Sequence, residues 1–208
     1  SMPRLQTTTL PLVVKIVLTL TLMGGCAATP PDTPTPTAEP EIKPFELPGL
    51  RLPTPEEGGH RAYLGVDPGE TFALADIRTR ILIIEVFNFY CPHCQKEAPN
   101  VNRLYRQIEN DARLRGQIKI IGIGIGNTAY EINQFRQKYA IPFPLFPDRS
   151  RSLSIQLEIR RTPTFIGWVY HPNGDIRPFL HAPGPMDGVA VFLDQVVRQS
   201  GVELAPGY

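Results

Sequence analysis

Two cysteines separated by two residues form the most reactive pattern in the sequence, Cys91-Pro92-His93-Cys94. An apolar, β-branched run ends just before them at Phe89, so we expect them where a buried strand passes into a helix. Two intervening residues at a helix start bring the sulfur atoms close enough to bond. Unpaired backbone N–H groups there stabilise a thiolate on Cys91, which lowers its pKa below the ordinary value of about 8.5. His93 can add charge or a hydrogen bond to that thiolate, and Pro92 suits the first turn of a helix.

The segments around the dithiol predict the elements that must position it. Continuous apolar or β-branched runs predict strands over residues 81–89, 118–125, 143–146, 164–170 and 176–180. Apolar residues at helical spacing predict helices over residues 97–111, 128–139, 150–157 and 189–198. Asn173-Gly174 predicts a hairpin between the last two strands. This order predicts an α/β domain with a mixed central sheet and helices on both faces.

The first 60 residues differ from the rest in composition. Ser1 before Met2 is interpreted as an expression scar, and an apolar run closed by Gly24-Gly25 is typical of a secretory signal peptide. This run is short for a membrane span of about 20 residues. Nine of the 23 prolines then lie between Ala27 and Gly58, a density that favours extended chain over a packed core. We therefore expect a signal peptide over 1–25, a Pro/Thr-rich linker over 26–60 and a folded domain over 61–208.

Charge and cysteine content exclude several classes of protein. A formal net charge of +1 provides no broad basic field for nucleic-acid binding. Three cysteines are too few for the disulfide framework of a small secreted scaffold.

The residues at the end of the apolar run carry a first resemblance. Met23-Gly24-Gly25-Cys26 resembles the lipobox of bacterial lipoproteins. That resemblance implies a lipid on Cys26 and attachment to a membrane of the bacterial cell envelope, on the periplasmic side. Ala27 stands where an aspartate would resemble an inner-membrane retention signal, which favours the outer membrane.

The dithiol and three other features resemble the thioredoxin superfamily over about Gly65 to Gly201. The resemblance implies a thioredoxin-like fold in which Cys91 is the attacking thiolate and Cys94 the resolving thiol. Glu85, six residues before Cys91, matches a buried acid that moves the proton of the resolving thiol. Thr162-Pro163 resembles the cis-proline loop, which lies against the dithiol and pairs with bound polypeptide. The final hairpin at Asn173-Gly174 completes the match.

Two branches of that superfamily share features with the chain. Tyr90 and the Pro-His dipeptide between the cysteines resemble the active-site segment of DsbA. The spacing of 69 positions from Cys94 to Pro163 and the lipobox instead resemble membrane-tethered TlpA/ResA proteins, as does Glu97, three residues after Cys94. These proteins are envelope thiol–disulfide oxidoreductases that need no cofactor.

The resemblance further implies partners and contact residues. The partners are protein thiols or disulfides of the envelope and a redox protein that resets the dithiol, and Tyr90, Thr162 and Pro163 contact the substrate. A histidine between the cysteines favours oxidation of partners, because whatever stabilises the reduced thiolate makes the disulfide a stronger oxidant. The residues leave the direction of electron flow open.

Three alternatives accompany this interpretation. Cys91 and Cys94 with a distant histidine, His171 or His181, could hold copper or zinc, as in an envelope copper-delivery protein. The dithiol could also be a permanent disulfide in a non-enzymatic interaction lipoprotein. Residues 124–129 formally match the dinucleotide fingerprint GxGxxA, although glycines in a strand often mark close packing. A peroxiredoxin is not indicated, because Asn88 stands where that family has threonine.

Overall fold

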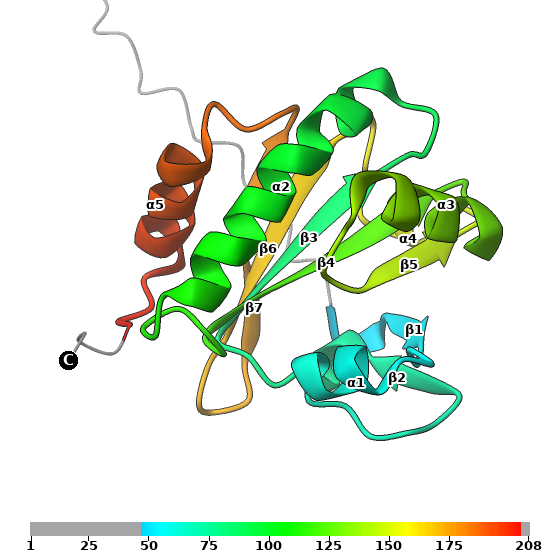
Figure 1. The fold of residues 1–208 in the computed structure, drawn as a ribbon. Helices are drawn as coiled ribbons and strands as arrows, with labels where there is room; N and C mark the ends of the chain where they lie inside the picture. Colours follow the sequence, from blue (N-terminus) through cyan, green and yellow to red (C-terminus); the bar gives the residue numbers. More distant parts are fainter. Residues whose placement is uncertain (1–46, 205–208) are drawn as a thin grey trace, which may run out of the picture. The chain divides into compact units, whose positions relative to one another are not determined.

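A computed structural model describes residues 47–204 of the chain (Figure 1). The expected signal peptide, the lipid on Cys26 and the linker up to residue 46 lie outside these residues. Among the helices of residues 47–204, none is long and apolar enough to cross a membrane.

A five-stranded mixed sheet forms the centre of the domain, with strand order β5-β4-β3-β6-β7. Strands β3, β4 and β5 are parallel, whereas β6 is antiparallel to β3 and β7 is antiparallel to β6. Their bounds are β3 Ile81–Phe87, β4 Ile118–Ile125, β5 Leu145–Asp148, β6 Thr164–Tyr170 and β7 Ile176–Pro183. The mixed α/β architecture expected from the sequence is confirmed.

Three helices cover one face of this sheet (Figure 1): α2 (Pro92–Asn110), α3 (Ala129–Tyr139) and α5 (Val189–Ser200). Their apolar side chains and alternate strand residues form one buried cluster, called the first cluster, which includes Ile83, Phe87, Cys94, Phe135 and Phe192. Helix α2 begins five residues before its predicted start. Its first turn is polar, so apolar spacing alone could not reveal it.

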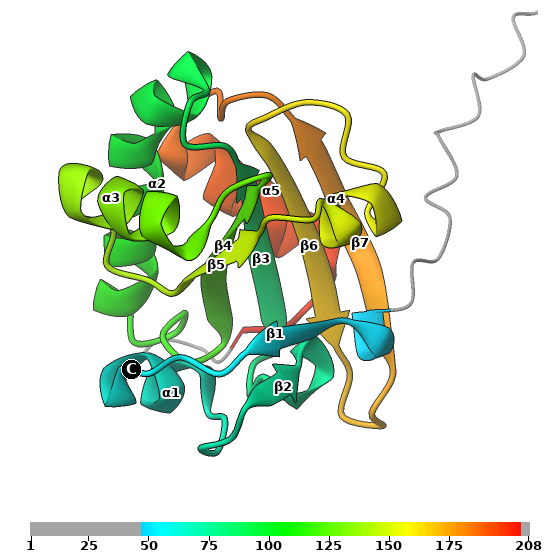
Figure 2. The same ribbon diagram turned by 90° about the vertical axis from the view of Figure 1, so that its right-hand side faces the viewer.

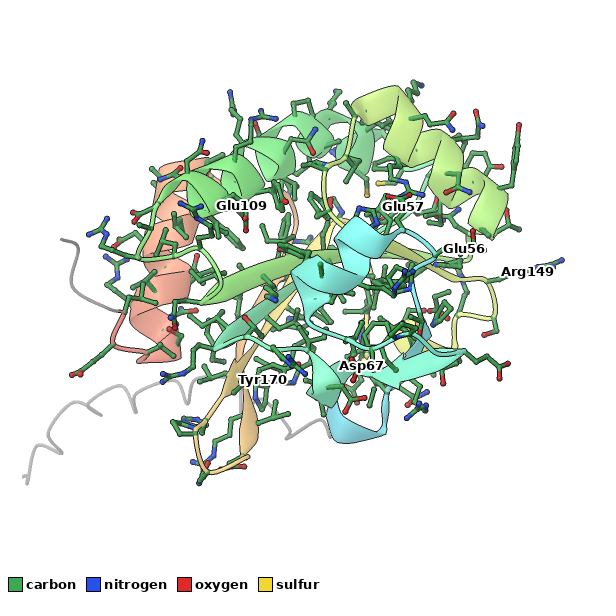
Figure 3. The ribbon with its side chains drawn as sticks, turned by 60° about the horizontal axis from the view of Figure 1, so that its bottom comes forward. Glu56, Glu57, Asp67, Glu109, Arg149 and Tyr170 are labelled. Carbon is green, nitrogen blue, oxygen red and sulfur yellow. The ribbon has the colours of Figure 1, made fainter. Side chains whose placement is uncertain are left out.

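The opposite face carries α4 (Ser152–Gln156) and a group of N-terminal elements, as Figure 2 shows. Buried side chains on this side form a second cluster, which includes Leu47, Leu52, Ile84, Leu153 and Trp168. Tyr170, labelled in Figure 3, lies at the end of β6. Its hydroxyl donates to the carbonyl of Leu74 at 2.6 Å, which ties the sheet to the N-terminal elements.

The N-terminal elements begin before residue 61, the expected start of the folded domain. They are η1 (Leu47–Gly49), β1 (Arg51–Pro53), α1 (Gly58–Leu64), β2 (Thr71–Ala73) and η2 (Leu74–Asp76). Leu47, Leu50 and Leu52 are at most 2% exposed, and β1 pairs with β2 in antiparallel register. The expected boundary therefore needs correction within the described residues. Pro53 is exposed and Pro55 lies in a loop, while Leu47, Leu50 and Leu52 belong to the second cluster.

The candidate redox site

The two cysteines lie where β3 passes into α2, as the sequence predicts. Cys91 is the N-cap residue of α2, and its Sγ accepts a hydrogen bond from the backbone N–H of Cys94 at 3.5 Å. Both cysteines are free thiols. Pro92 occupies the first helical position, where a backbone N–H would have no partner within the helix, so the lack of one costs nothing.

The two thiols have opposite environments. Cys94 is fully buried and belongs to the first cluster, and burial is the main reason that its pKa rises to about 12. Cys91 is partly exposed. Its partial burial opposes ionisation, but hydrogen bonds from the Thr162 side chain and the backbone N–H groups of Cys94 and His93 outweigh this and lower its pKa. Cys91 is thus the accessible, more acidic thiol, and Cys94 is the buried, less acidic one.

The Thr162-Pro163 loop leads into β6, the neighbour of β3 in the sheet, and lies against Cys91. The peptide bond between these two residues is cis, and the Cys91 thiol donates to the Thr162 carbonyl at 3.4 Å. The Pro163 carbonyl accepts from Gly184 N–H at 2.8 Å, which fixes the loop to the segment after β7. The structure therefore brings together Cys91, Cys94, Thr162 and Pro163.

Two buried carboxyl groups lie on the same side of the sheet as Cys94. Ile83 and Phe87 point into the first cluster, and because alternate strand residues share a face, Glu85 between them points there too. Glu85 is 1% exposed, and its Oε1 has no hydrogen-bond partner within residues 47–204. Burial, and then repulsion by Glu97, raise the pKa of Glu85 to about 8. A group that exchanges its proton near neutral pH thus lies on the same face of the sheet as Cys94.

Glu97 lies one turn after Cys94 on α2 and is 4% exposed. One of its carboxylate oxygens accepts from Met186 N–H at 3.1 Å and the other from the Asn100 amide at 3.2 Å. Glu97 therefore ties α2 to the loop before α5 as well as facing Glu85.

Tyr90 and His93 lie on the solvent side of the site. Tyr90 is 66% exposed, and its hydroxyl donates to the Glu131 carboxylate at 2.5 Å, which raises the pKa of Tyr90. His93 is exposed in the first turn of α2. Its contribution to Cys91 within the described chain comes from its backbone N–H, not its imidazole.

Three residues that the sequence did not single out for the site hold the segment before Cys91. The Asn88 amide donates to the Ile125 carbonyl at 2.7 Å, and its side-chain oxygen accepts from Tyr90 N–H at 2.9 Å. Asn127 is fully buried, and its oxygen accepts from Phe89 N–H at 2.9 Å. Glu131 caps Thr128 at the start of α3 while it holds the Tyr90 hydroxyl. Asn88 and Asn127 follow the ends of β3 and β4, but nothing local in the sequence pairs these three residues with the segment before Cys91.

In the GxGxxA pattern, Gly124 serves close packing, whereas Gly126 adopts a positive φ in the turn after β4. Gly124 faces α3, where a Cβ atom would overlap Cδ1 of Ile132 and lie 3.0 Å from Asn127 Oδ1. Asp148 at the end of β5 accepts from Leu153 and Ser154 N–H at the start of α4.

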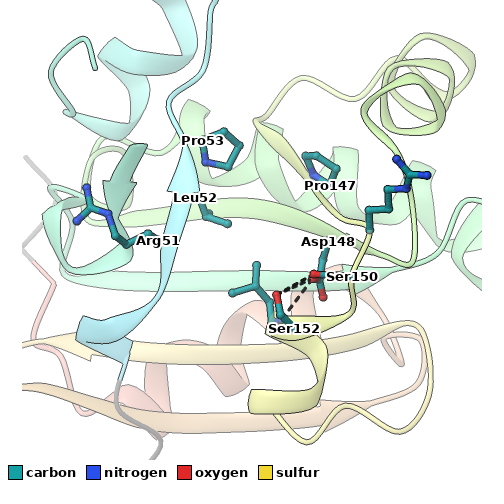
Figure 4. Close-up of a pocket in the computed structure, with 9 residues that line it drawn as sticks. Arg51, Leu52, Pro53, Pro147, Asp148, Ser150 and Ser152 are labelled. Carbon is teal, nitrogen blue, oxygen red and sulfur yellow. Dashed lines mark hydrogen bonds between the residues drawn. The ribbon is translucent and has the colours of Figure 1, made fainter. Parts of the chain in front are cut away.

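A hollow of about 490 Å³ lies at the edge of the molecule between β1 and the end of β5 (Figure 4). It is lined by Arg51, Leu52, Pro53, Pro147, Asp148, Arg149, Ser150, Ser152 and Leu153. Neither Cys91 nor Cys94 lines it. Within residues 47–204, no three His, Cys, Asp or Glu side chains gather as a metal site requires.

Known proteins share sequence with this chain over the region that holds the two cysteines. Residues 45–178 match the AhpC/TSA family. The chain is similar to the thiol-disulfide oxidoreductase ResA of Halalkalibacterium halodurans, with 24% identity over 108 residues, or 52% of this chain and 57% of that protein. It is 19% identical to ResA of Bacillus subtilis over 108 residues, covering 52% of this chain and 56% of that protein. These matches span little more than half the length of the relatives.

Solved structures confirm the fold. A protein of Chlorobium tepidum assigned as a thiol:disulfide interchange protein DsbE aligns with a TM-score of 0.53 at 12% identity, over 74% of this chain and 94% of that one. A protein of Neisseria meningitidis assigned as a thioredoxin gives 0.51 at 18% identity, over 65% and 86%. The fold is therefore thioredoxin-like, as the sequence indicated.

Proposed function

The chain belongs to the AhpC/TSA family, and we propose that it is a thiol–disulfide oxidoreductase of the cell envelope that exchanges disulfides with proteins through Cys91 and Cys94. The observation that carries this proposal is the asymmetry of the two thiols. Cys91 is partly exposed with a lowered pKa beside the Thr162-Pro163 loop, and Cys94 is buried one turn behind it with a raised pKa. A permanent structural disulfide would need no such difference.

The exchange has two steps. The Cys91 thiolate attacks one sulfur of a partner disulfide, a mixed disulfide forms, and the partner's other sulfur leaves as a thiolate. Cys94 then loses its proton and attacks the Cys91 sulfur, which closes the Cys91–Cys94 disulfide and releases the second partner thiolate. Two electrons pass to the partner. Disulfide donation is the same sequence in reverse.

Glu85 accepts the Cys94 proton in this scheme, and Glu97 beside it favours the protonated form of Glu85 by repulsion. A base with a pKa near the working pH is suited to this transfer. The partner chain contacts a surface formed by Tyr90, Thr162 and Pro163. The His93 imidazole is exposed to solvent on the side from which the partner approaches.

Location and partners belong to the same proposal. A lipid on Cys26 holds the domain to an envelope membrane, with the outer membrane favoured by Ala27, and the Pro/Thr-rich residues that follow act as a spacer. The partners are envelope proteins with thiols or disulfides, together with a redox protein that resets the dithiol. ResA relatives named as thiol-disulfide oxidoreductases support exchange with protein thiols.

The test is the Cys91/Cys94 reduction potential in glutathione buffers, with a chain that begins at Ala27. A value above about −150 mV identifies a disulfide donor, and one below about −230 mV identifies a reductant. Cys91→Ser should abolish exchange. A chain that neither equilibrates with glutathione nor reduces a protein disulfide contradicts the proposal, as does consumption of hydroperoxide at a rate that exceeds disulfide exchange.

A further inference from the structure

The segment between β5 and β6, residues 149–161, concentrates positive charge. It contains four arginines and one glutamate, although the whole chain has a formal charge of only +1. We call this the arginine segment; its arginines are Arg149, Arg151, Arg160 and Arg161. All four are exposed. Within residues 47–204 none of them forms an ion pair, whereas arginines in other parts of the domain pair with acids, namely Arg113, Arg136, Arg177 and Arg198.

Both ends of the arginine segment reach the redox site. Its C-terminal end leads directly into Thr162, whose carbonyl is 3.4 Å from Cys91 Sγ. Near its N-terminal end, the Arg151 guanidinium lies over Gly126, where an added Cβ would be 3.3 Å from Arg151 Nε. Gly126 is flanked by Ile125 and Asn127, which hold the residues before Cys91. The positive charge therefore borders the approach to Cys91 on two sides.

The acidic groups at this end do not cancel that charge. Asp148 is 3% exposed, and its carboxylate accepts N–H groups of α4. Even with Asp148 counted against them, basic residues outnumber acidic ones by two over residues 148–161. Glu131 accepts hydrogen bonds from Tyr90 and Thr128 and keeps its negative charge. Glu158 and Asp187 are the other acids of these loops, and the exposed Lys96 in the second turn of α2 adds a further positive charge. Five basic residues then stand against four acidic ones, so the charge at this end stays positive.

The arginine segment also has the composition of a contact surface. Ile155 of α4 is 72% exposed, and the Arg149 side chain projects away from the body of the domain (Figure 3). Arginine beside exposed apolar side chains is typical of protein interfaces.

We propose that the arginine segment selects protein partners whose reacting cysteine is flanked by acidic residues. This inference rests on the proposed function and names the substrate class of the same site. A partner sulfur that reaches Cys91 must place its neighbouring residues beside Thr162, within reach of the arginines. Opposite charges there raise the rate of productive encounter, and salt weakens the effect.

The experiment measures disulfide reduction with three peptides of one length. Each holds a single disulfide, flanked by Asp/Glu, by Ser/Gln or by Lys/Arg. The reduced chain beginning at Ala27 reacts with each in about 20 mM and about 500 mM NaCl, which shortens the reach of surface charge from over 10 Å to a few ångströms. Each rate is divided by the rate of the same peptide with dithiothreitol, an uncharged dithiol, to remove intrinsic differences in peptide reactivity.

The expected result at low salt is a normalised rate about 3–10 times higher for the acidic peptide than for the neutral one, and lower for the basic one. At high salt the three rates converge. In the variant Arg151→Gln/Arg160→Gln, the ratio of the normalised rate for the acidic peptide to that for the neutral peptide falls towards one. The matched control is Arg106→Gln/Arg115→Gln, which removes two exposed arginines on the later turns of α2 and before β4, far along the chain from Cys91. It should keep the ratio.

Several results would overturn the inference. Equal normalised rates for the three peptides at low salt would leave disulfide exchange intact but refute charge selection. If the preference for the acidic peptide persisted in Arg151→Gln/Arg160→Gln, residues outside the arginine segment would be its cause. If those substitutions weakened binding to phosphatidylserine vesicles without changing the peptide ratio, the surface would be a membrane contact instead. A chain that neither reduces any of the three peptides nor, in its disulfide form, oxidises their reduced dithiol forms would refute the proposed function itself.

Discussion

At the scale of single residues, the environments of the two sulfur atoms decide the order of reaction. Cys91 has helix N–H groups and Thr162 around it, whereas Cys94 sits among apolar side chains. A thiol reacts as its thiolate, so only Cys91 offers a nucleophile at neutral pH.

The separate ionisation of the two thiols can be measured directly. In Cys94→Ala, we expect the absorbance of the Cys91 thiolate at 240 nm to titrate below the ordinary pKa of about 8.5, because its hydrogen bonds favour the charged form. In Cys91→Ala, Cys94 should show no thiolate below about pH 10, since burial raises its pKa to about 12. Equal midpoints in the two variants would contradict the asymmetry on which the mechanism depends.

Glu85 gives a second prediction, on stability against pH. Its pKa is raised from an ordinary 4.5 to about 8 in the folded chain, so the unfolded chain releases this proton first. Stability from this group is complete below about pH 4.5 and is lost as pH rises to about 8. At about 1.4 kcal/mol per pKa unit, the loss is on the order of 3–5 kcal/mol.

Urea unfolding of the wild type and Glu85→Gln at pH 5 and pH 8, followed by circular dichroism, measures this loss. The wild type should lose stability between the two pH values, and Glu85→Gln should lose several kcal/mol less. Glu158→Gln, which changes an exposed acid, should behave as the wild type. The same Glu85→Gln chain should also lose the inflection near pH 8 in its exchange rate. A parallel fall in stability for the wild type and Glu85→Gln would refute the raised pKa.

At the scale of elements, the position of the site depends on how closely α3 approaches β4. Gly124 leaves room for Ile132, and the same turn presents Asn127 to the backbone of Phe89. A β4 strand with a larger residue here would push α3 outward and with it the turn that holds the segment before Cys91.

Gly124→Ala should therefore lower the free energy of unfolding by about 1–3 kcal/mol, the usual cost of overpacking a core. Ile132→Val removes the Cδ1 atom that the new methyl group meets, so Gly124→Ala/Ile132→Val should be more stable than the sum of the two single changes predicts. Urea midpoints of the four chains complete the double-mutant cycle. Strict additivity would show that Ile132 is not the obstacle.

At the scale of the whole domain, residues 47–60 belong to the fold. Leu52 is 1% exposed in the second cluster, and Leu52→Ala should cost about 2–5 kcal/mol, as buried leucines do. Pro53→Ala, at an exposed neighbour in β1, should cost far less. A chain that starts at residue 61 should unfold at much lower urea than one that starts at residue 47. Equal urea midpoints for these two chains would show that residues 47–60 add no stability and that the domain begins near residue 61.

The sequence alone predicted the sheet and the dithiol, since runs such as residues 118–125 and 164–170 are β-branched and bounded by turns, and Cys-x-x-Cys is local in sequence. It did not predict the elements formed by residues 47–60, because Pro density masks the three leucines that become buried only in the second cluster, among residues distant in sequence. Nor did it predict the roles of Asn88, Asn127 and Glu131. Their hydrogen bonds join segments about 40 residues apart, and no local pattern records such a pairing.

One buried residue of the second cluster determines what optical measurements can report. Trp168 is the only tryptophan of the chain and is 2% exposed. It packs with Leu47 and Leu52 on one face of the sheet, while Cys94 lies in the first cluster on the other. Intrinsic fluorescence will therefore follow the packing of the N-terminal elements and stay nearly silent when the dithiol is oxidised or reduced. The redox state of this protein must be read by thiol chemistry, and its emission kept as an independent signal of folding.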